Sequence, residues 1–323
     1  MTALLEVRGL CTEFSTRAGL VKAVDDLSFS LEPGQIMGLV GESGSGKSMT
    51  GYSIMGLVDA PGKITAGSIL FKGRQLRGLA AEPMRQLRGD RIAMIFQDPM
   101  MTLNPVLRID TQMIETVQAH RAVGHDAARA MARAALVRVG MAAPDARLAA
   151  YPHQFSGGMR QRVAIAIALI NEPDLIICDE PTTALDVTIQ GQILSEMQAL
   201  CRAAGTALIW ITHDLSVVAG LADTVSVMYA GKIVESGTTA QVLEQPRHPY
   251  SAGLIASAPS RNARGAALHQ IPGMTPSLLN LPEGCAFRTR CASAGAACDT
   301  TPPLQQSDGR TLRCFHPVAG PSQ

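Results

Sequence analysis

The chain has 323 residues, of which 46% are hydrophobic and 17% are charged. This length and composition exclude a disordered chain and allow one large folded domain with a smaller one. The formal net charge of +1 gives no overall electrostatic reason to bind nucleic acid or an acidic membrane surface.

The sequence contains no candidate membrane-spanning segment. Its most continuous apolar stretch, residues 163–170, falls far short of the ~18 residues that such a helix needs. The N-terminus lacks the charged start, apolar core and cleavage site of a secretory signal. We therefore expect a cytosolic protein that reaches a membrane only through partner proteins.

The first predicted elements are strands. Residues 4–8 and 27–31 alternate apolar and polar side chains, as half-buried antiparallel strands do. Residues 36–40 form a nearly continuous apolar run, and residues 175–178 and 207–211 form two more. Such runs are typical of strands buried on both faces of a parallel sheet. The pattern predicts an α/β fold with a parallel-sheet core and an antiparallel β subdomain.

A helical insertion is predicted between the first and second of these apolar runs. Residues 108–150 are rich in Ala, Arg and Met. Four apolar residues recur there at helical spacing: Ala127, Met131, Ala134 and Ala135. We expect an inserted helical subdomain at about residues 100–165.

The last part of the chain has a different composition. From about residue 248, Pro, Gly and Ser become frequent and periodicity is lost, which predicts a loop-rich extension. The predicted domains are therefore residues 1–247 and 248–323. Four of the seven cysteines crowd into this extension: Cys285, Cys291, Cys298 and Cys314. In a reducing cytosol such a cluster favours a metal site over disulfides.

Residues 41–48 are the strongest functional motif. They read Gly-Glu-Ser-Gly-Ser-Gly-Lys-Ser and fit the P-loop pattern at every fixed position. The alternative is a Gly/Ser-rich turn without a ligand, but a buried-strand pattern precedes the motif and a helical one follows it. Backbone N–H groups and the helix N-terminus would hold the phosphates, Lys47 would reach the β- and γ-phosphates, and Ser48 would coordinate Mg²⁺. The candidate nucleotide-binding residues are Gly41, Ser43, Gly44, Ser45, Gly46, Lys47 and Ser48.

A pair of carboxylates follows the predicted strand at residues 175–178. Asp179 would complete the Mg²⁺ site, and Glu180 could polarise the attacking water as a general base. Such a pair after a strand is usually a solvated turn. Because a P-loop lies upstream, we expect it to be the second half of an ATP site.

Residues 155–162, Phe-Ser-Gly-Gly-Met-Arg-Gln-Arg, resemble the signature of ABC ATPases, usually written Leu-Ser-Gly-Gly-Gln. Phe replaces Leu and Met replaces Gln, but the Ser-Gly-Gly core is intact, so we expect activity to survive. Alone, the motif would more often be only a helix N-cap. Further residues match the family's motifs in order: Phe14 for adenine stacking, Gln97 for the Q-loop, Thr183 to Asp186 for the D-loop and His213 for the switch histidine.

The resemblance implies both a fold and a mechanism. The fold is that of a P-loop NTPase with a RecA-like core. Gln97 would sense Mg²⁺ and the γ-phosphate, and His213 would donate a hydrogen bond to that phosphate. The signature residues Ser156, Gly157 and Gly158 would contact the nucleotide held by a partner subunit, with the D-loop Asp186 nearby, so two subunits would enclose two ATP molecules.

The tail resembles the C-terminal extension of oligopeptide and dipeptide ABC ATPases. The similarity lies in residues 247–250, 271–276, 282–287 and 290–291, and residues 96–105 are also typical of that branch. It implies uptake of di- or oligopeptides by a peripheral subunit at the cytoplasmic face of the inner membrane. The implied partners are two permease subunits, a second ATPase that makes a heterodimer, and an extracytoplasmic solute-binding protein. Close relatives in this branch import nickel chelates or glutathione, which remain alternatives.

The four tail cysteines are spaced C-x₅-C-x₆-C-x₁₅-C. Some family members with this spacing hold a [4Fe–4S] cluster, for which four thiolates are a complete ligand set. Zn²⁺ is the alternative, although the short spacing within pairs that is usual for zinc is absent. Four unligated thiols are the third possibility.

One other class of function remains open, a soluble ABC ATPase that acts on ribosomes or DNA. Such proteins usually carry two cassettes or long coiled-coil insertions, and this chain has one cassette and neither insertion. The near-zero net charge and the aromatic content of 4% also argue against a nucleic-acid partner.

Overall fold

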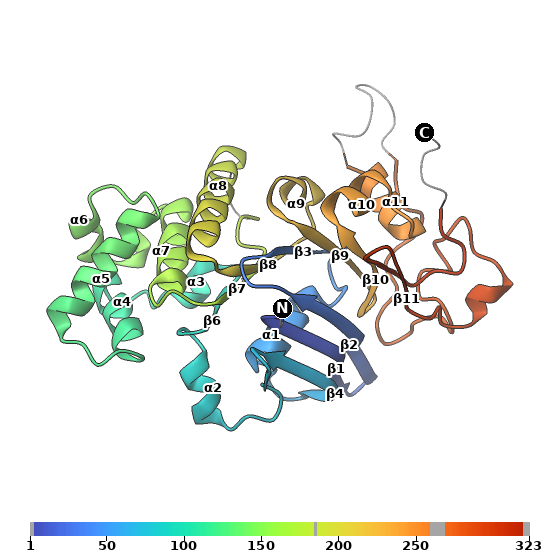
Figure 1. Cartoon of the computed structure of the whole chain (residues 1–323), viewed down its shortest axis with the longest axis horizontal. Coiled ribbons are helices and arrows are strands. Elements are labelled where there is room, and N and C mark those ends of the chain that lie inside the picture. The colour runs from blue at the N-terminus through green and yellow to red at the C-terminus, as the bar shows by residue number, and fades with distance from the viewer. Residues whose placement is uncertain (1–2, 184–185, 259–268, 319–323) are drawn as a thin grey trace. The chain divides into compact units, whose positions relative to one another are not determined.

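The structure is a computed structural model that describes residues 3–183, 186–258 and 269–318 (Figure 1). The described residues form two compact units. The first unit comprises those within Met1–Leu31, Ile36–Arg77 and Ile211–Gln323, and the second comprises Glu32–Gln35 and those within Gly78–Trp210. In these described ranges, no helix combines the length and apolar character required to cross a membrane.

The first unit contains an antiparallel sheet in the order β2-β1-β4-β5. Its strands are β1 (Leu5–Thr16), β2 (Gly19–Leu31), β4 (Gly62–Phe71) and β5 (Arg74–Gln75). Leu5 lies opposite Leu31, so the strands expected at residues 4–8 and 27–31 pair with each other. Both strands are longer than their alternating patterns indicated, because they continue towards the turn that joins them.

A second set of strands in the first unit runs in the order β11-β12-β10-β9-β3. The strands are β3 (Ile36–Val40), β9 (Thr224–Tyr229), β10 (Lys232–Thr238), β11 (Gln305–Ser307) and β12 (Arg310–Leu312). β3 is buried at every position and runs parallel to β9, as its continuous apolar run predicted. β12 pairs antiparallel with β10 through Glu235 and Leu312, so the tail adds strands to this sheet.

The helices of the first unit are short. They are α1 (Lys47–Met55), α9 (Leu215–Leu221), α10 (Thr239–Glu244), α11 (Pro249–Ala256) and the 3₁₀ turn η3 (Ala296–Asp299). An aromatic cluster joins the sheet to the tail. The ring of Tyr229 on β9 lies 4.6 Å from that of Tyr250 and 5.3 Å from that of Phe287, measured between centroids. Aromatic contacts at these distances add stability beyond the area they bury, so the tail shares a core with β9.

The second unit contains parallel strands and most of the helices. Its strands are β6 (Ile92–Ile95), β7 (Leu175–Asp179) and β8 (Ala207–Thr212), of which β8 belongs to this unit through Trp210. β6 runs parallel to β7, with Ile95 opposite Cys178. β7 and β8 are buried at every position, which confirms the two remaining buried-strand predictions.

Among its described residues the second unit has eight helical segments, several drawn in green in Figure 1. They are α2 (Ala81–Leu87), α3 (Pro99–Thr102), α4 (Ile109–Gln118), α5 (His125–Arg138), α6 (Pro144–Leu148), η1 (Pro152–Gln154), α7 (Gly157–Leu169) and α8 (Val187–Ala204). The segments from α3 to α7 lie between Pro99 and Leu169.

The four apolar residues that indicated α5 do not all lie on its buried face. Ala127 and Ala134 are exposed, and Met131 is only half-buried. Ala135 of that set is buried, together with Ala128, Ala132 and Leu136. The apolar pattern could not orient this helix because alanine occurs on nearly all of its faces, so only packing against neighbouring helices selects one.

Candidate nucleotide site and cysteine cluster

The P-loop lies between β3 and α1, as the sequence predicted. Gly41 and Gly46 have φ of 156° and 103°, and Gly46 immediately precedes the first helical residue, Lys47. A Cβ atom would come within 2.2 Å of the Met228 carbonyl oxygen at Gly41, and within 2.1 Å of the Ala23 carbonyl oxygen at Gly46. Only glycine fits at these positions, so the close approach of neighbouring backbone explains the motif's spacing.

Two polar side chains of the P-loop are buried in a way that suits a phosphate ligand. The Lys47 ammonium donates to the carbonyl oxygens of Gly41 at 2.8 Å and Glu42 at 3.0 Å. The Ser45 hydroxyl is fully buried, and it has no hydrogen-bond partner among the described residues. An unsatisfied buried hydroxyl costs roughly 1–3 kcal/mol. The loop therefore holds a cation and an unpaired hydroxyl at the N-terminus of α1, where an anion is favoured.

Two further predicted nucleotide residues belong to the first unit. Phe14 on β1 is half-buried, and a Cβ at the facing Gly62 would come within 2.5 Å of its ring. Glycine at that position therefore leaves room for the ring. His213 directly follows β8, and its side chain is exposed and therefore accessible to a ligand. Adenine stacking by Phe14 and the hydrogen bond from His213 stay predictions.

The second unit carries the predicted residues at the carboxyl ends of its strands. Asp179 is buried at the end of β7, and Gln97 is exposed shortly after β6. Because β6 and β7 are neighbouring parallel strands, both residues lie at the same edge of the sheet. Glu180 has φ of 46°, and the Thr183 hydroxyl donates to its carboxylate at 3.1 Å. A left-handed conformation is uncommon for glutamate and is a recurring feature of functional sites.

The signature residues form the start of α7 in the second unit. The Ser156 hydroxyl caps this helix by accepting a hydrogen bond from the Met159 N–H at 3.4 Å, and Ser156 and Gly157 are exposed. A Cβ at Gly158 would come within 3.0 Å of Ile189 on α8, so a larger residue would crowd that helix. Phe155 is buried, which explains why an aromatic residue can occupy a position that is usually leucine.

The D-loop is only partly described. The Asp186 carboxylate caps α8 by accepting a hydrogen bond from the Ile189 N–H at 3.0 Å. Ala184 and Leu185 lie outside the described residues. The Asp186 cap is a local structural role, and its part in an ATPase dimer stays a prediction.

Glu42, a variable position of the P-loop pattern, is a residue that the sequence analysis missed. Arg290 donates to its two carboxylate oxygens at 2.7 and 3.1 Å, and the Thr275 hydroxyl donates at 2.6 Å. Burial raises the pKa of Glu42, but these hydrogen bonds and the charges of Arg290 and Lys47 outweigh it, so the pKa lies below its ordinary value. No sequence signal could have found the contact, because its partners lie more than 230 positions away.

The four tail cysteines line one small cavity. Cys285, Cys291, Cys298 and Cys314 surround it together with residues that include His248 and His316. Burial raises the pKa of the Cys285 and Cys291 thiols, and it raises that of Cys314 to about 11. Four thiols around one cavity are a suitable donor set for a metal site. In the part of the chain that the structure describes, however, no three Cys, His, Asp or Glu residues form a metal-binding group.

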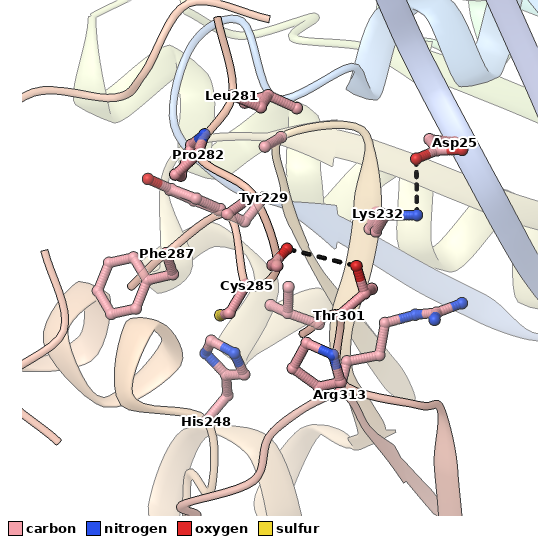
Figure 2. A pocket seen from close by; sticks show the side chains of 15 residues that line it. Asp25, Tyr229, Lys232, His248, Leu281, Pro282, Cys285, Phe287, Thr301 and Arg313 are labelled. Atoms are coloured by element: carbon pink, nitrogen blue, oxygen red, sulfur yellow. Dashed lines mark hydrogen bonds and ion pairs between the residues drawn. The ribbon is translucent and has the colours of Figure 1, made fainter. Parts of the chain in front are cut away.

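A larger pocket adjoins this cavity and shares residues with it. Figure 2 shows Cys285 and His248 at its wall, opposite Lys232 and Thr301. Lys232 pairs with Asp25 at 2.7 Å, so this lysine is neutralised. Burial lowers the pKa of His248 to about 4, so this histidine is uncharged at neutral pH.

Family models match two parts of the chain. One described as "ABC transporter" matches residues 24–183, and one described as "Oligopeptide/dipeptide transporter, C-terminal region" matches residues 234–298. The oligopeptide transport ATP-binding protein OppD of Escherichia coli (strain K12) is 49% identical over 98% of this chain and 94% of its own. The dipeptide transport ATP-binding protein DppD of Bacillus subtilis (strain 168) is 48% identical over 98% of this chain and 95% of its own.

Solved structures show a similar fold. The ATP-binding cassette MJ0796, a dimer in a post-hydrolysis state bound to ADP and Pi, has a TM-score of 0.66 at 24% identity, covering 73% of this chain and 98% of that one. CbiO1 of Clostridium perfringens, part of the ABC transporter complex cbiONQ, has a TM-score of 0.64 at 26% identity, covering 75% of this chain and 91% of that one. The chain therefore belongs to the ATP-binding proteins of ABC transporters, within their oligopeptide/dipeptide group.

Proposed function

We propose that the chain is the ATP-hydrolysing subunit of an importer that moves di- or oligopeptides across the cytoplasmic membrane. The observation that carries the proposal is the extent of the similarity to oligopeptide and dipeptide transport proteins, which spans 98% of the chain. It covers the tail as well as the P-loop region, and a general ATPase cassette would match only the latter. We also propose residues 1–247 as the ATPase domain, with helices at about 100–165, and residues 248–323 as its extension.

The first step is the capture of ATP by the P-loop. The backbone N–H groups from Gly41 to Gly46 and the N-terminus of α1 hold the phosphates. Lys47 exchanges its two backbone carbonyl partners for phosphate oxygens, and Ser45 gains the partner that it lacks. Ser43 and Gly44 supply further loop N–H groups. Ser48 is proposed as one ligand for Mg²⁺, and Asp179 and Gln97 are each proposed as further ligands; the ion would neutralise charge on the phosphates.

The second step is hydrolysis. Glu180 accepts a proton from the attacking water, whose oxygen bonds to the γ-phosphorus as the bond to the ADP oxygen breaks. The hydrogen bond from Thr183 orients the Glu180 carboxylate. His213 donates to the γ-phosphate and stabilises its developing charge. Phe14 stacks on the adenine ring and sets the position of the nucleotide.

The signature residues act in trans. Ser156 and the N–H groups of Gly157 and Gly158 form an exposed helix N-terminus, which suits the γ-phosphate held by a second ATPase subunit. Asp186 supports the same interface. We propose a heterodimer with a related ATPase, bound to two permeases and supplied by an extracytoplasmic solute-binding protein. The subunit is then peripheral at the cytoplasmic face, and nucleic acid is not a partner.

The four tail cysteines are proposed to hold a [4Fe–4S] cluster, with zinc as the alternative. Their convergence on one cavity and their number support this role. A bound metal favours the thiolate form and offsets the burial that raises the pKa of Cys285, Cys291 and Cys314. The role is structural, because a metal there would tie together loops that have little apolar core of their own.

The function is tested by purifying the tagged chain from its native membranes and identifying every bound protein. Two permeases, a second ATPase and a solute-binding protein whose bound ligand is a peptide would support the proposal. A binding protein loaded with a nickel chelate or glutathione would keep the ATPase role and change the cargo. Ribosomes or DNA without a permease would contradict the transport role.

A further inference from the structure

We propose that the tail controls the shape and charge of the P-loop through one ion pair, in which Arg290 is a positioning residue for ATP and Glu42 is its attachment point. The inference rests on the proposed ATPase function. It adds a role for the tail that neither the P-loop chemistry nor the cysteines require.

Three hydrogen bonds from other side chains hold the Glu42 carboxylate. Both carboxylate oxygens of Glu42 accept from the Arg290 guanidinium, and the Thr275 hydroxyl adds a third donor at 2.6 Å. The Arg290 side chain is 5% exposed and that of Glu42 is 27% exposed. A two-point contact between a guanidinium and a carboxylate fixes orientation as well as distance. The ion pair therefore restricts the loop more than an exposed pair would.

The backbone of Glu42 is held at the same time. Its N–H donates to the Tyr250 hydroxyl at 2.9 Å, and its carbonyl oxygen accepts from the Lys47 ammonium at 3.0 Å. Glu42 thus joins two tail residues, Arg290 and Tyr250, to the lysine that reaches for phosphate. A P-loop that is already held in one conformation loses less entropy when ATP binds.

The charge of Glu42 gives Arg290 a second role. A carboxylate inside a phosphate-binding loop repels a triphosphate, because like charges at short range disfavour each other. Arg290 cancels this charge. Removing Arg290 therefore harms ATP binding twice, by releasing the loop and by exposing the phosphates to an unpaired carboxylate.

Arg290 is itself positioned by the tail. Its Nε donates to the Pro272 carbonyl oxygen at 2.8 Å, and its backbone N–H donates to the Phe287 carbonyl oxygen at 3.0 Å. It lies between Cys285 and Cys291 in the chain, both of which line the cysteine cavity. The turn that carries two of the clustered cysteines therefore also presents Arg290 to the P-loop.

The test measures the affinity of the full-length chain for a fluorescent ATP analogue. Arg290→Met should weaken binding roughly tenfold, which corresponds to about 1.4 kcal/mol, while kcat at saturating ATP changes much less. Glu42→Gln should weaken binding less, because the amide still accepts a hydrogen bond and the repulsive charge is gone. The double variant should bind ATP better than Arg290→Met alone, since it no longer leaves an unpaired carboxylate.

Arg288→Met is the matched control. Arg288 lies on the same turn, but it pairs with the exposed Asp299 and makes no contact with Glu42 among the hydrogen bonds of the described residues, so this variant should bind ATP like the wild type. Arg290→Lys provides a second variant if Arg290→Met fails to fold. It keeps the charge and loses the two-point contact, so binding should weaken by about threefold.

Two results would overturn the inference. Equal ATP affinity in the wild type and Arg290→Met would show that the pair does not position the loop. A double variant as weak as, or weaker than, Arg290→Met would remove the charge argument and leave only loss of packing. Failure of the wild type to bind ATP would instead contradict the proposed ATPase function, so the two failures are distinguishable.

Discussion

The Tyr250 hydroxyl accepts a hydrogen bond from the Glu42 backbone N–H at 2.9 Å. Tyr250 is fully buried, and burial raises the pKa of its phenol, so the hydroxyl stays neutral. Its ring packs against Tyr229 on β9, which keeps the phenol in place. Tyr250, a residue of the tail, therefore contacts the P-loop directly.

Tyr250→Phe should destabilise the protein by about 1–2 kcal/mol, because the Glu42 N–H loses its hydrogen-bond partner. The aromatic packing of the ring remains. The free energy of unfolding from urea titration measures this change, and a loss of ATP affinity should accompany it. Unchanged stability together with unchanged ATP affinity would show that water replaces the hydroxyl without cost.

Glu180→Gln should lower kcat by roughly 10²–10⁴-fold while ATP still binds, because the amide cannot accept a proton from water. Phosphate release and nucleotide titration measure the two properties separately. Stabilisation of the closed dimer is also expected, seen as an ATP-dependent larger species in gel filtration.

Glu172→Gln is the matched control for this variant. Glu172 also has a left-handed backbone, with φ of 56°, but it lies before β7 at the opposite end of that strand. Its replacement should leave kcat unchanged. Undiminished turnover in Glu180→Gln would remove Glu180 as the general base.

Cys291→Ser should remove most of the bound iron, because a [4Fe–4S] cluster needs its full set of thiolates. ATP binding by the P-loop should persist at least in part. Metal analysis should give about four irons per wild-type chain, since that is the content of one such cluster. Cys11→Ser serves as the control, because Cys11 lies on β1 and is absent from the cysteine cavity. Iron content that is the same in both variants, or about one zinc per chain, would contradict the iron assignment.

Arg162→Met should destabilise the second unit by about 2 kcal/mol. Arg162 donates to the Glu196 carboxylate at 2.6 Å and to the Val139 carbonyl oxygen, and its side chain is 11% exposed. Removing it leaves a partly buried carboxylate unpaired, which costs more than the loss of an exposed ion pair. Urea unfolding measures the difference.

Arg85→Met is the control for the Arg162 experiment. The ion pair of Arg85 with Glu82 on α2 is exposed on both sides, so its removal should leave the stability essentially unchanged. Similar losses in the two variants would mean that the Arg162 pair stabilises the unit no more than a surface pair does.

Local features of the fold could be predicted from the sequence. β3, β7 and β8 are short apolar runs apart from Asp179 and Thr212 at the ends of β7 and β8, and strands buried on both faces require such runs whatever surrounds them. The P-loop was equally predictable, since its fixed residues lie within eight consecutive positions, 41–48. The orientation of α5 could not be predicted, because an alanine-rich helix has several faces of similar hydrophobicity.

The candidate site residues were predicted from residue type and spacing, and their roles stay predictions, whereas the contacts around the P-loop could not be predicted. Asp179 and Gln97 follow strands that the structure pairs in parallel, so both reach the same edge of the sheet. Glu42 was passed over, because the motif leaves its identity open and nothing nearby in the chain marks it. The tail was expected to be a separate loop-rich extension, and in the structure β12 pairs with β10.

The sequence by itself determined the motifs that indicate the family of this protein: a P-loop, a carboxylate pair, a signature and four clustered cysteines, each defined within a few consecutive residues or a fixed spacing. Only the tertiary structure decided that Arg290 meets Glu42 across 248 positions of the chain, and that Tyr250 supports the same loop. Motifs are readable because the backbone links their residues directly. Distant contacts depend on how strands pair and cores pack, and no local pattern encodes that outcome.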